Sequence, residues 1–446
     1  MEITLLFLLC QSFLIVVCYN YYGILPFPTI LVAYISICQL MYGLAHDGIA
    51  QTEMFFLYRM GGLEHNFVFT QLFYLGISAY VTLCCVVFRT RSRSRHERLT
   101  VPQLRKVVSR GTSAILLLAL AVQLSILLAF LNWDIVLRND EYLLMTSPDA
   151  VIGDSSFLHG LFGSMTFVGP LAATMAAFSH SMKRPLFFAG FAIISVCYFL
   201  FLLSAHSRSA ALSPVAFAAV LWMTGAERHW KAILFASTLA ALSIVSGLAG
   251  RGGGVEGFAS LPGTFANIFD RNNGKNIIDL LANICEGIFV TGEGFRVNES
   301  HPTLYKILSL SPAPSFVDGF AYINDAQQIR LHDYVPMSGF SEFYLFGFPY
   351  NMACVFIVTL AIYISMKLRE INKTMFIVCN TMQFLSFYIL NAYPIRNGLK
   401  PLWLVYLLAL LVVPGLLRRS SFARRRKPPL AFDEENAAFP RNEHLE

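Results

Sequence analysis

Long apolar runs separated by short polar segments make up most of this chain. Each run approaches the roughly 20 apolar residues that a helix needs to cross a bilayer. A backbone in lipid must satisfy its own hydrogen bonds, which favours helices. The pattern predicts an all-α integral membrane protein with about eleven transmembrane helices. The predicted spans are residues 3–19, 23–43, 67–88, 112–131, 156–179, 186–204, 210–225, 231–249, 342–365, 374–391 and 401–417.

The positions of lysine and arginine predict how these spans are oriented. Basic residues gather in five segments, and with eleven spans all five lie on one side of the membrane. Basic loops tend to stay in the cytoplasm, so we predict a cytoplasmic C-terminus and an N-terminus outside. The chain starts without a cationic signal sequence, so we expect the first span to be retained. The five segments are residues 89–110, 183–184, 228–231, 367–373 and 418–427.

One outer segment, residues 250–341, is much longer than the others. Within it, apolar residues recur at helical spacing between Ile277 and Phe289, which is typical of an amphipathic helix. We expect two or three short helices lying on the outer membrane face. The predicted divisions are residues 1–249 (spans one to eight), 250–341 (a helical extracytoplasmic subdomain), 342–417 (spans nine to eleven) and 418–446 (a disordered cytoplasmic tail).

Composition supports the membrane assignment and narrows the function. Apolar residues make up 56% of the chain and charged residues 13%, whereas a soluble domain carries about 25% charge. The net charge of +6 comes from the orienting clusters and does not indicate nucleic acid. The middle of each predicted span lacks ionisable residues, which weighs against ion-coupled transport. The sequence also lacks a P-loop, a His-Glu-x-x-His zinc motif and a Gly-x-Ser-x-Gly elbow.

Arginines at the outer ends of the later spans are candidates for binding a phosphorylated substrate. Arg208 follows the sixth span, and Arg251 precedes three glycines whose N–H groups can converge on an anion. Arg330 and Arg396 lie further along on the same side. A guanidinium can hold phosphate oxygens in a bidentate fork. The structural alternatives are snorkelling of Arg208 to the head groups and a flexible linker at Arg251.

Glu342 is the leading candidate for a general base. It lies at the start of the ninth span, where a carboxylate can orient or deprotonate a hydroxyl. The alternative is a helix start, with Ser341 as the cap and Glu342 complementing the helix dipole. His301 and His332 in the long loop are further candidates, and the alternative is that both are solvated. The residue pattern requires no metal or other cofactor.

The chain resembles the bacterial O-antigen, or oligosaccharide repeat-unit, polymerases (Wzy-type). The likeness is best over about residues 200–365 and includes the large outer loop late in the chain. It also rests on the Ser-Arg-Ser stretch around Arg208, on Ser-Leu-Ser-Pro-Ala-Pro-Ser-Phe at 309–316, and on Gly-Phe-Ser-Glu-Phe-Tyr-Leu-Phe-Gly at 339–347.

This resemblance implies a multi-span, glycosyltransferase C-like enzyme of the bacterial inner membrane. Such enzymes join undecaprenyl-pyrophosphate-linked oligosaccharide units into O-antigen or capsular polysaccharide on the outer face. The expected partners are that lipid-linked substrate, membrane lipid and a chain-length regulator protein, with no nucleic acid and no cofactor. The alternatives are an O-antigen ligase that transfers to lipid A core, a lipid-linked oligosaccharide flippase or polysaccharide transporter, and a non-catalytic scaffold.

Overall fold

The computed structural model describes most of the chain, and the observations below refer to that part. The described residues are 2–22, 27–49, 63–88, 110–140, 144, 147–153, 155–250, 256–268, 277–313, 323, 326–332, 335–371, 373–407 and 409–410. The basic segment 89–109, Arg251 and the tail 418–446 therefore lie outside it.

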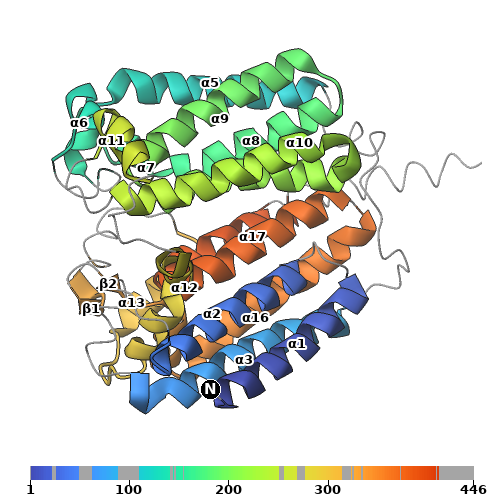
Figure 1. Cartoon of the computed structure of the whole chain (residues 1–446), viewed down its shortest axis with the longest axis vertical. Coiled ribbons are helices and arrows are strands. Elements are labelled where there is room, and N and C mark those ends of the chain that lie inside the picture. The colour runs from blue at the N-terminus through green and yellow to red at the C-terminus, as the bar shows by residue number, and fades with distance from the viewer. Residues whose placement is uncertain are drawn as a thin grey trace, which may run out of the picture.

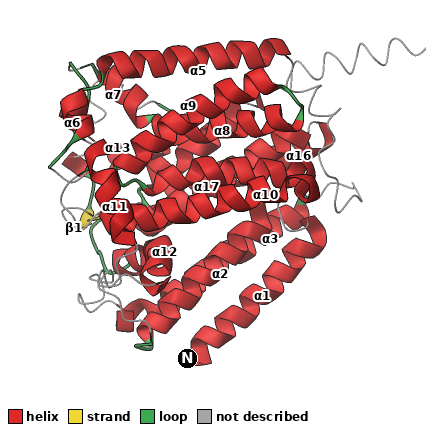
Figure 2. Cartoon of the chain, turned by 45° about the horizontal axis from the view of Figure 1, so that its top comes forward, coloured by secondary structure: helices red, strands yellow, loops and turns green. Residues whose placement is uncertain are grey.

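The described chain is mostly helical and forms two bundles, each with its own apolar core. They lie one above the other in Figure 1, and Figure 2 shows how little strand accompanies them. The first bundle contains α5 (Arg110–Phe130), α6 (Trp133–Leu137), α7 (Ser156–Gly163), α8 (Met165–Ser181), α9 (Pro185–Ser204) and α10 (Leu212–Gly250). The second contains α2 (Phe27–His46), α3 (Leu63–Val87), α12 (Ile277–Gly294), α13 (Thr303–Leu310), α15 (Gly339–Phe346), α16 (Phe348–Ile371) and α17 (Lys373–Ala392), with α1 (Glu2–Tyr22) packed against α2 and α3.

Seven of the described helices are long and apolar enough to cross a membrane, or eight if the bent pair α7–α8 counts as one span. These eight overlap eight of the eleven predicted spans. The ninth, predicted at 342–365, begins only at Phe348, because Gly347 with a φ of 83° separates α16 from the short helix α15 that contains Glu342. The other three, 210–225, 374–391 and 401–417, also fall on helix as far as the chain is described, but they do not meet the same test of length and apolarity. The membrane assignment is thus confirmed, and the count of eleven remains a prediction.

Helix α10 contains a reversal of the chain. A straight helix of its 39 residues would be about 58 Å long. A Cβ built on Gly247, near its end, would nevertheless lie only 3.2 Å from the carbonyl oxygen of His206, just before its start. The two halves of α10 therefore run in opposite directions, as expected if residues 210–225 and 231–249 are separate membrane segments.

The outward faces of the helices carry large apolar side chains. Leu9 and Phe13 on α1, Ile115 on α5, Phe235 on α10 and Phe356 on α16 are each about two-thirds exposed or more. Large exposed apolar side chains on so many helices are typical of a protein surrounded by lipid.

The segments predicted to lie outside meet at one end of the bundles, at the left in Figure 1. Asn139 and Glu256 exchange backbone hydrogen bonds of 2.9 and 2.8 Å, and the Gly257 N–H donates to the Ser204 carbonyl. Shorter elements gather at the same end. They are η3 (Pro148–Ala150), η4 (Arg208–Ala211), η5 (Phe258–Ser260), α11 (Leu261–Ile268) and the antiparallel hairpin β1 (Arg330–His332) and β2 (Val335–Pro336).

The long loop differs from its expected arrangement in one respect. It does form short helices, but α12 is packed between α2, α3 and α17 and does not lie on the membrane face. Cys285, Ile288 and Phe289 on this helix are almost completely buried. Glycines permit the close approach: a Cβ on Gly287 would clash with the Asn391 carbonyl oxygen of α17. Small residues serve this purpose at helix contacts in membranes.

This close contact predicts a strong effect of one methyl group. We expect Gly287→Ala to destabilise the protein by about 1–3 kcal/mol, because the clash is partly with backbone that cannot rotate away. Thermal unfolding in detergent measures the change. The matched control is Gly160→Ala in α7, where a Cβ meets nothing within 4 Å. Equal unfolding temperatures for the two variants would contradict the packing described above.

Candidate functional site

The chain passes from α17 into the last helix, residues 395–410 with residue 408 undescribed, at the centre of a polar cluster. Residues 391–396, which contain the two helix ends and the short turn between them, are called the central turn below. This turn is joined by hydrogen bonds to α15 and to the C-terminal end of α13. The Gly339 N–H at the start of α15 donates to the Tyr393 carbonyl at 2.7 Å. The Ile395 N–H and the Arg396 side chain make the other contacts. Groups more than 50 residues apart in sequence therefore converge on this turn.

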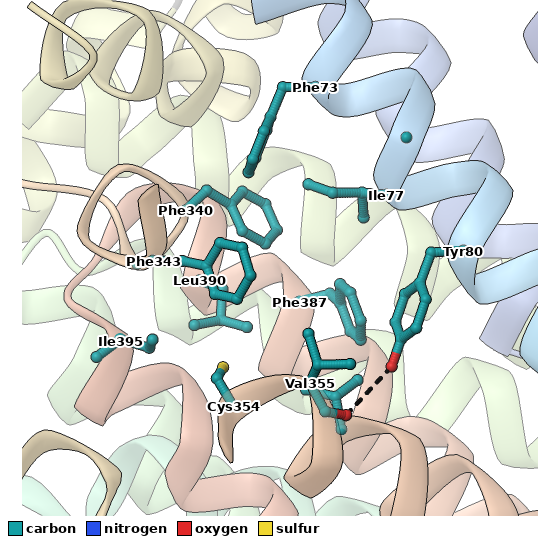
Figure 3. A pocket seen from close by; sticks show the side chains of 13 residues that line it. Phe73, Ile77, Tyr80, Phe340, Phe343, Cys354, Val355, Phe387, Leu390 and Ile395 are labelled. Atoms are coloured by element: carbon teal, nitrogen blue, oxygen red, sulfur yellow. Dashed lines mark hydrogen bonds between the residues drawn. The ribbon is translucent and has the colours of Figure 1, made fainter. Parts of the chain in front are cut away.

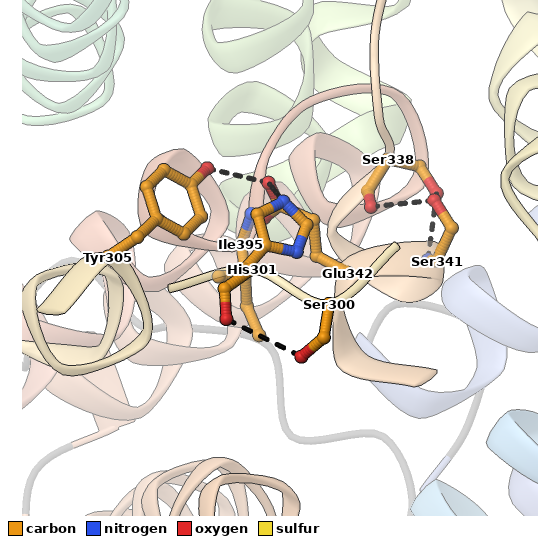
Figure 4. Close-up of polar contacts among 7 residues, drawn as sticks. All are labelled: Ser300, His301, Tyr305, Ser338, Ser341, Glu342 and Ile395. Atoms are coloured by element: carbon orange, nitrogen blue, oxygen red, sulfur yellow. Dashed lines mark hydrogen bonds and ion pairs between the residues drawn. The ribbon is translucent and has the colours of Figure 1, made fainter. Parts of the chain in front are cut away.

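Glu342 is completely buried and accepts two hydrogen bonds (Figure 4). The Tyr305 hydroxyl donates to Oε1 at 2.6 Å, and the Ile395 N–H donates to Oε2 at 2.7 Å. The carboxylate thus joins α13, α15 and the first turn of the last helix. Burial raises the pKa of Glu342 to about 7, although the two hydrogen bonds act in the opposite direction. A carboxyl group with such a pKa exchanges its proton near neutral pH, as a general base requires.

The local sequence explains how α15 presents this carboxylate. The Ser338 side chain accepts a hydrogen bond from the Ser341 N–H at 3.1 Å, so Ser338 is the N-cap residue. The expectation that Ser341 caps this helix is wrong. Ser341 instead lies inside the first turn, where its hydroxyl donates back to the Ser338 carbonyl. Glu342 follows on the buried side of the helix.

His301 lies against the same carboxylate. Its Nε2 is 3.7 Å from Glu342 Oε1, and its ring stacks on Tyr305 with centroids 4.7 Å apart. Burial lowers the pKa of His301 to about 4, and the nearby Lys306 charge adds to this. His301 is therefore neutral at pH 7, and neither ring nitrogen has a hydrogen-bond partner among the described residues. Because its pKa lies below that of Glu342, the neutral imidazole leaves the proton on the carboxyl group and can accept a hydrogen bond from it.

Arg396 is buried beside this cluster and anchors α13. Its Nη1 donates to the Leu308 carbonyl at 2.7 Å and its Nη2 donates to the Ala313 carbonyl at 2.6 Å. Cationic side chains near a helix C-terminus satisfy the last carbonyls in this way. The structure therefore gives Arg396 an anchoring role. Its predicted contact with pyrophosphate stays a prediction.

Arg208 lies where the two bundles meet. Its Nη2 donates to Glu286 Oε2 of α12 at 3.0 Å, and both side chains are about three-quarters buried. His206, with a φ of 46°, makes the sharp turn that precedes it, a backbone conformation uncommon outside glycine. The His206 ring lies within hydrogen-bond distance of Thr264 and Ser260, which tie the turn to α11 and η5. Tyr393 of the central turn is in electrostatic range of the Arg208 guanidinium.

A chain of buried hydroxyl and amide groups continues from the central turn into the second bundle. Asn391 donates to the Tyr34 hydroxyl at 2.9 Å and accepts a short hydrogen bond from the Tyr74 hydroxyl. Tyr74 contacts Thr291 at 3.0 Å, and Thr291 contacts Ser338 at 2.7 Å. This chain links α2, α3, α12, α15 and α17 and gives the site a rigid support.

The remaining predicted site residues are not brought into the cluster. Arg251 lies outside the described residues. Arg330 begins the β1–β2 hairpin with an exposed side chain, and His332 ends β1, its side chain lying outside the described part. The structure thus places Glu342, His301 and Arg396 together and puts Arg208 on the other side of the central turn. Within the described residues, no group of three or more His, Cys, Asp and Glu side chains is placed to hold a metal ion.

Four contributors to the site were not identified from the sequence: Tyr305, Glu286, Lys306 and Asn391. Tyr305 lies in α13, which begins at Thr303, whereas His301 precedes this helix, so the stacking of the two rings does not follow from a helical spacing. Glu286 and Asn391 lie inside apolar stretches, and their partners Arg208 and Tyr74 become adjacent only when the helices pack together.

Comparisons with protein-family models, with curated proteins and with solved structures gave no match. The function of the cluster is therefore argued from its geometry and chemistry.

Proposed function

We propose that this protein is a glycosyltransferase that polymerises lipid-pyrophosphate-linked oligosaccharide units at the outer membrane face. The observation that carries the proposal is the turn at residues 391–396. It holds a buried carboxyl group with a pKa near 7 on one side and has Arg208 in electrostatic range on the other. Chain growth on a pyrophosphate donor needs these two functions, a base for the acceptor and a cation for the leaving group.

In the proposed reaction, an acceptor hydroxyl attacks the anomeric carbon of the donor sugar. A new glycosidic bond forms, the bond from that carbon to the pyrophosphate oxygen breaks, and lipid pyrophosphate leaves. Glu342 takes the hydroxyl proton, and neutral His301 accepts a hydrogen bond from the protonated carboxyl group. Arg208 binds the pyrophosphate and offsets the charge that develops on it.

Access to Glu342 requires a movement of α13. Tyr305 of this helix covers Oε1, and the carboxylate has no exposed surface. We infer that the acceptor sugar displaces α13, and that its hydroxyl replaces the Tyr305 hydroxyl as the hydrogen-bond donor. In the structure, Arg396 holds the end of α13 in the position that covers Glu342. We call this arrangement the closed state.

The proposal includes the eleven crossings, with the N-terminus and the polar cluster outside the cytoplasm. The reversal within α10 and the gathering of the long-loop segments at one end support it. An inner-membrane site that faces the periplasm suits a substrate that has already been translocated.

A strain deleted for this gene tests the function. We expect its surface lipopolysaccharide ladder to collapse to core plus a single repeat unit. Bare core with accumulated lipid-linked polymer would instead indicate a ligase, and failure of single units to reach the core would indicate a flippase. An unchanged ladder would contradict a role in lipopolysaccharide.

A further inference from the structure

A cavity of about 290 Å³ lies beside α15, between this helix and α3 (Figure 3). Its lining is almost entirely apolar. Phe340 and Phe343 of α15 and Phe387 of α17 face Ile77 and Tyr80 of α3 across it. Among the polar atoms near this lining, the Tyr80 hydroxyl is already bonded to Thr359 at 2.6 Å. The cavity therefore offers packing contacts and almost no hydrogen bonds.

The cavity opens toward the membrane between α3 and α16. Gly76, which lines it, is exposed, and a Cβ built there meets nothing within 4 Å. Both flanking helices are candidate membrane spans. Below the opening, the contact between Tyr80 and Thr359 joins α3 to α16. An occupant can thus enter sideways from the bilayer.

The cavity also adjoins the polar cluster through shared residues. Ile395 lines the cavity with its side chain, while its N–H donates to Glu342. In α15, Phe340 and Phe343 face the cavity, and Glu342 lies on the polar side. A molecule with an apolar chain in the cavity therefore has its polar end near the outer ends of α15 and α16.

We propose that this cavity holds a segment of the isoprenoid chain of the lipid-linked substrate. This inference rests on the proposed function, because that function supplies a substrate with such a chain. The volume lies at the lower end of the range for small-molecule sites, so it fits part of a chain and not a compact ligand. The bilayer interior is as apolar as the cavity, so moving a lipid chain from one to the other gains little hydrophobic free energy. Selectivity for an isoprenoid chain therefore comes from the packing of its methyl branches between the aromatic rings.

The experiment measures lipid binding to the purified protein in detergent by native mass spectrometry. The probes are undecaprenyl phosphate and, as a membrane lipid with straight chains, phosphatidylglycerol. Gly76→Leu narrows the mouth of the cavity and Val358→Phe fills its inner part. Gly160→Leu, at an open helical position in α7, is the matched control. Unfolding temperatures show that each variant is folded.

We expect wild type to bind undecaprenyl phosphate at least tenfold more tightly than phosphatidylglycerol. Gly76→Leu and Val358→Phe should each weaken this binding at least tenfold, and Gly160→Leu should leave it unchanged. Wild-type affinity in both cavity variants would overturn the proposal. The proposal would also be overturned if wild type bound the two lipids equally and the cavity variants weakened both equally, since the cavity would then accept any bilayer chain.

This assay contains no sugar and no turnover, so its outcome is separate from that of the proposed function. Cavity-dependent binding of undecaprenyl phosphate supports the inference even if the polysaccharide ladder of the deletion strain is unchanged. Conversely, a collapsed ladder together with cavity-independent binding would overturn the inference alone.

Discussion

Replacing Arg208 by alanine is expected to lower the rate of chain growth about 10²–10³-fold, the typical effect of removing one donor that stabilises developing negative charge. The variant should still insert into the membrane. The guanidinium is held by Glu286 and is therefore in place before substrate arrives. Complementation of a deletion strain, with the polymer ladder quantified on gels and the protein by blotting, measures the effect.

Variants of Glu286, the ion-pair partner of Arg208, show whether Arg208 binds substrate or only joins the two bundles. If Arg208 only joins the two bundles, Arg208→Ala leaves the Glu286 carboxylate without its partner, and the double variant Arg208→Ala/Glu286→Ala should regain activity. If Arg208 binds pyrophosphate, the double variant stays inactive and Glu286→Ala alone keeps most of its activity. Recovery in the double variant would remove Arg208 from the proposed reaction.

Replacing Glu342 by glutamine is expected to lower chain growth about 10²–10⁴-fold, as for loss of a general base, with the fold retained. The amide oxygen can still accept from the Ile395 N–H, and the Tyr305 hydroxyl can rotate to accept from the amide nitrogen. Glu299→Gln, at an exposed carboxylate in the same loop, is the control. Full activity of Glu342→Gln would show that the carboxylate serves only to hold α13, α15 and the last helix together.

The stability of wild type is expected to depend on pH in a way that Glu342→Gln removes. Burial raises the folded-state pKa of Glu342 to about 7 from 4.5, so the folded state binds its proton more strongly than the unfolded state. The resulting stability is fully present below pH 4.5 and is lost as pH rises through about 7. We expect the unfolding temperature of wild type to fall between about pH 4.5 and about pH 7 relative to that of Glu342→Gln, and to level off above that range. Parallel curves for the two proteins would contradict the raised pKa that burial gives this carboxyl group.

Much of the fold could be predicted from the sequence because lipid imposes simple rules. Apolar runs of about 20 residues in a membrane form helices, and the described helices fall where the runs predicted them. The position of α12 could not be predicted, because its apolar face suits either a membrane surface or a bundle interior. The choice depends on glycines such as Gly287, whose neighbour Asn391 is more than 100 residues away in sequence.

The candidate site could be predicted only in part, for a related reason. Glu342 and His301 were identified by residue type and by their place near the membrane surface, and the structure brings them within 3.7 Å of each other. The partners that determine their protonation, Tyr305 and the Ile395 N–H, come from other helices. The amino acid sequence alone carries no signal for a backbone N–H that points at a carboxylate.

The most direct test of the central claim is a reconstituted reaction. Purified protein in proteoliposomes is supplied with undecaprenyl-pyrophosphate-linked repeat units alone, without a nucleotide sugar and in the presence of a metal chelator. The account predicts a ladder of lipid-linked polymer and release of one undecaprenyl pyrophosphate for each bond formed, with both lost in Arg208→Ala. Absence of polymer from wild type under these conditions, with polymer appearing only when a nucleotide sugar or a metal ion is added, would contradict it.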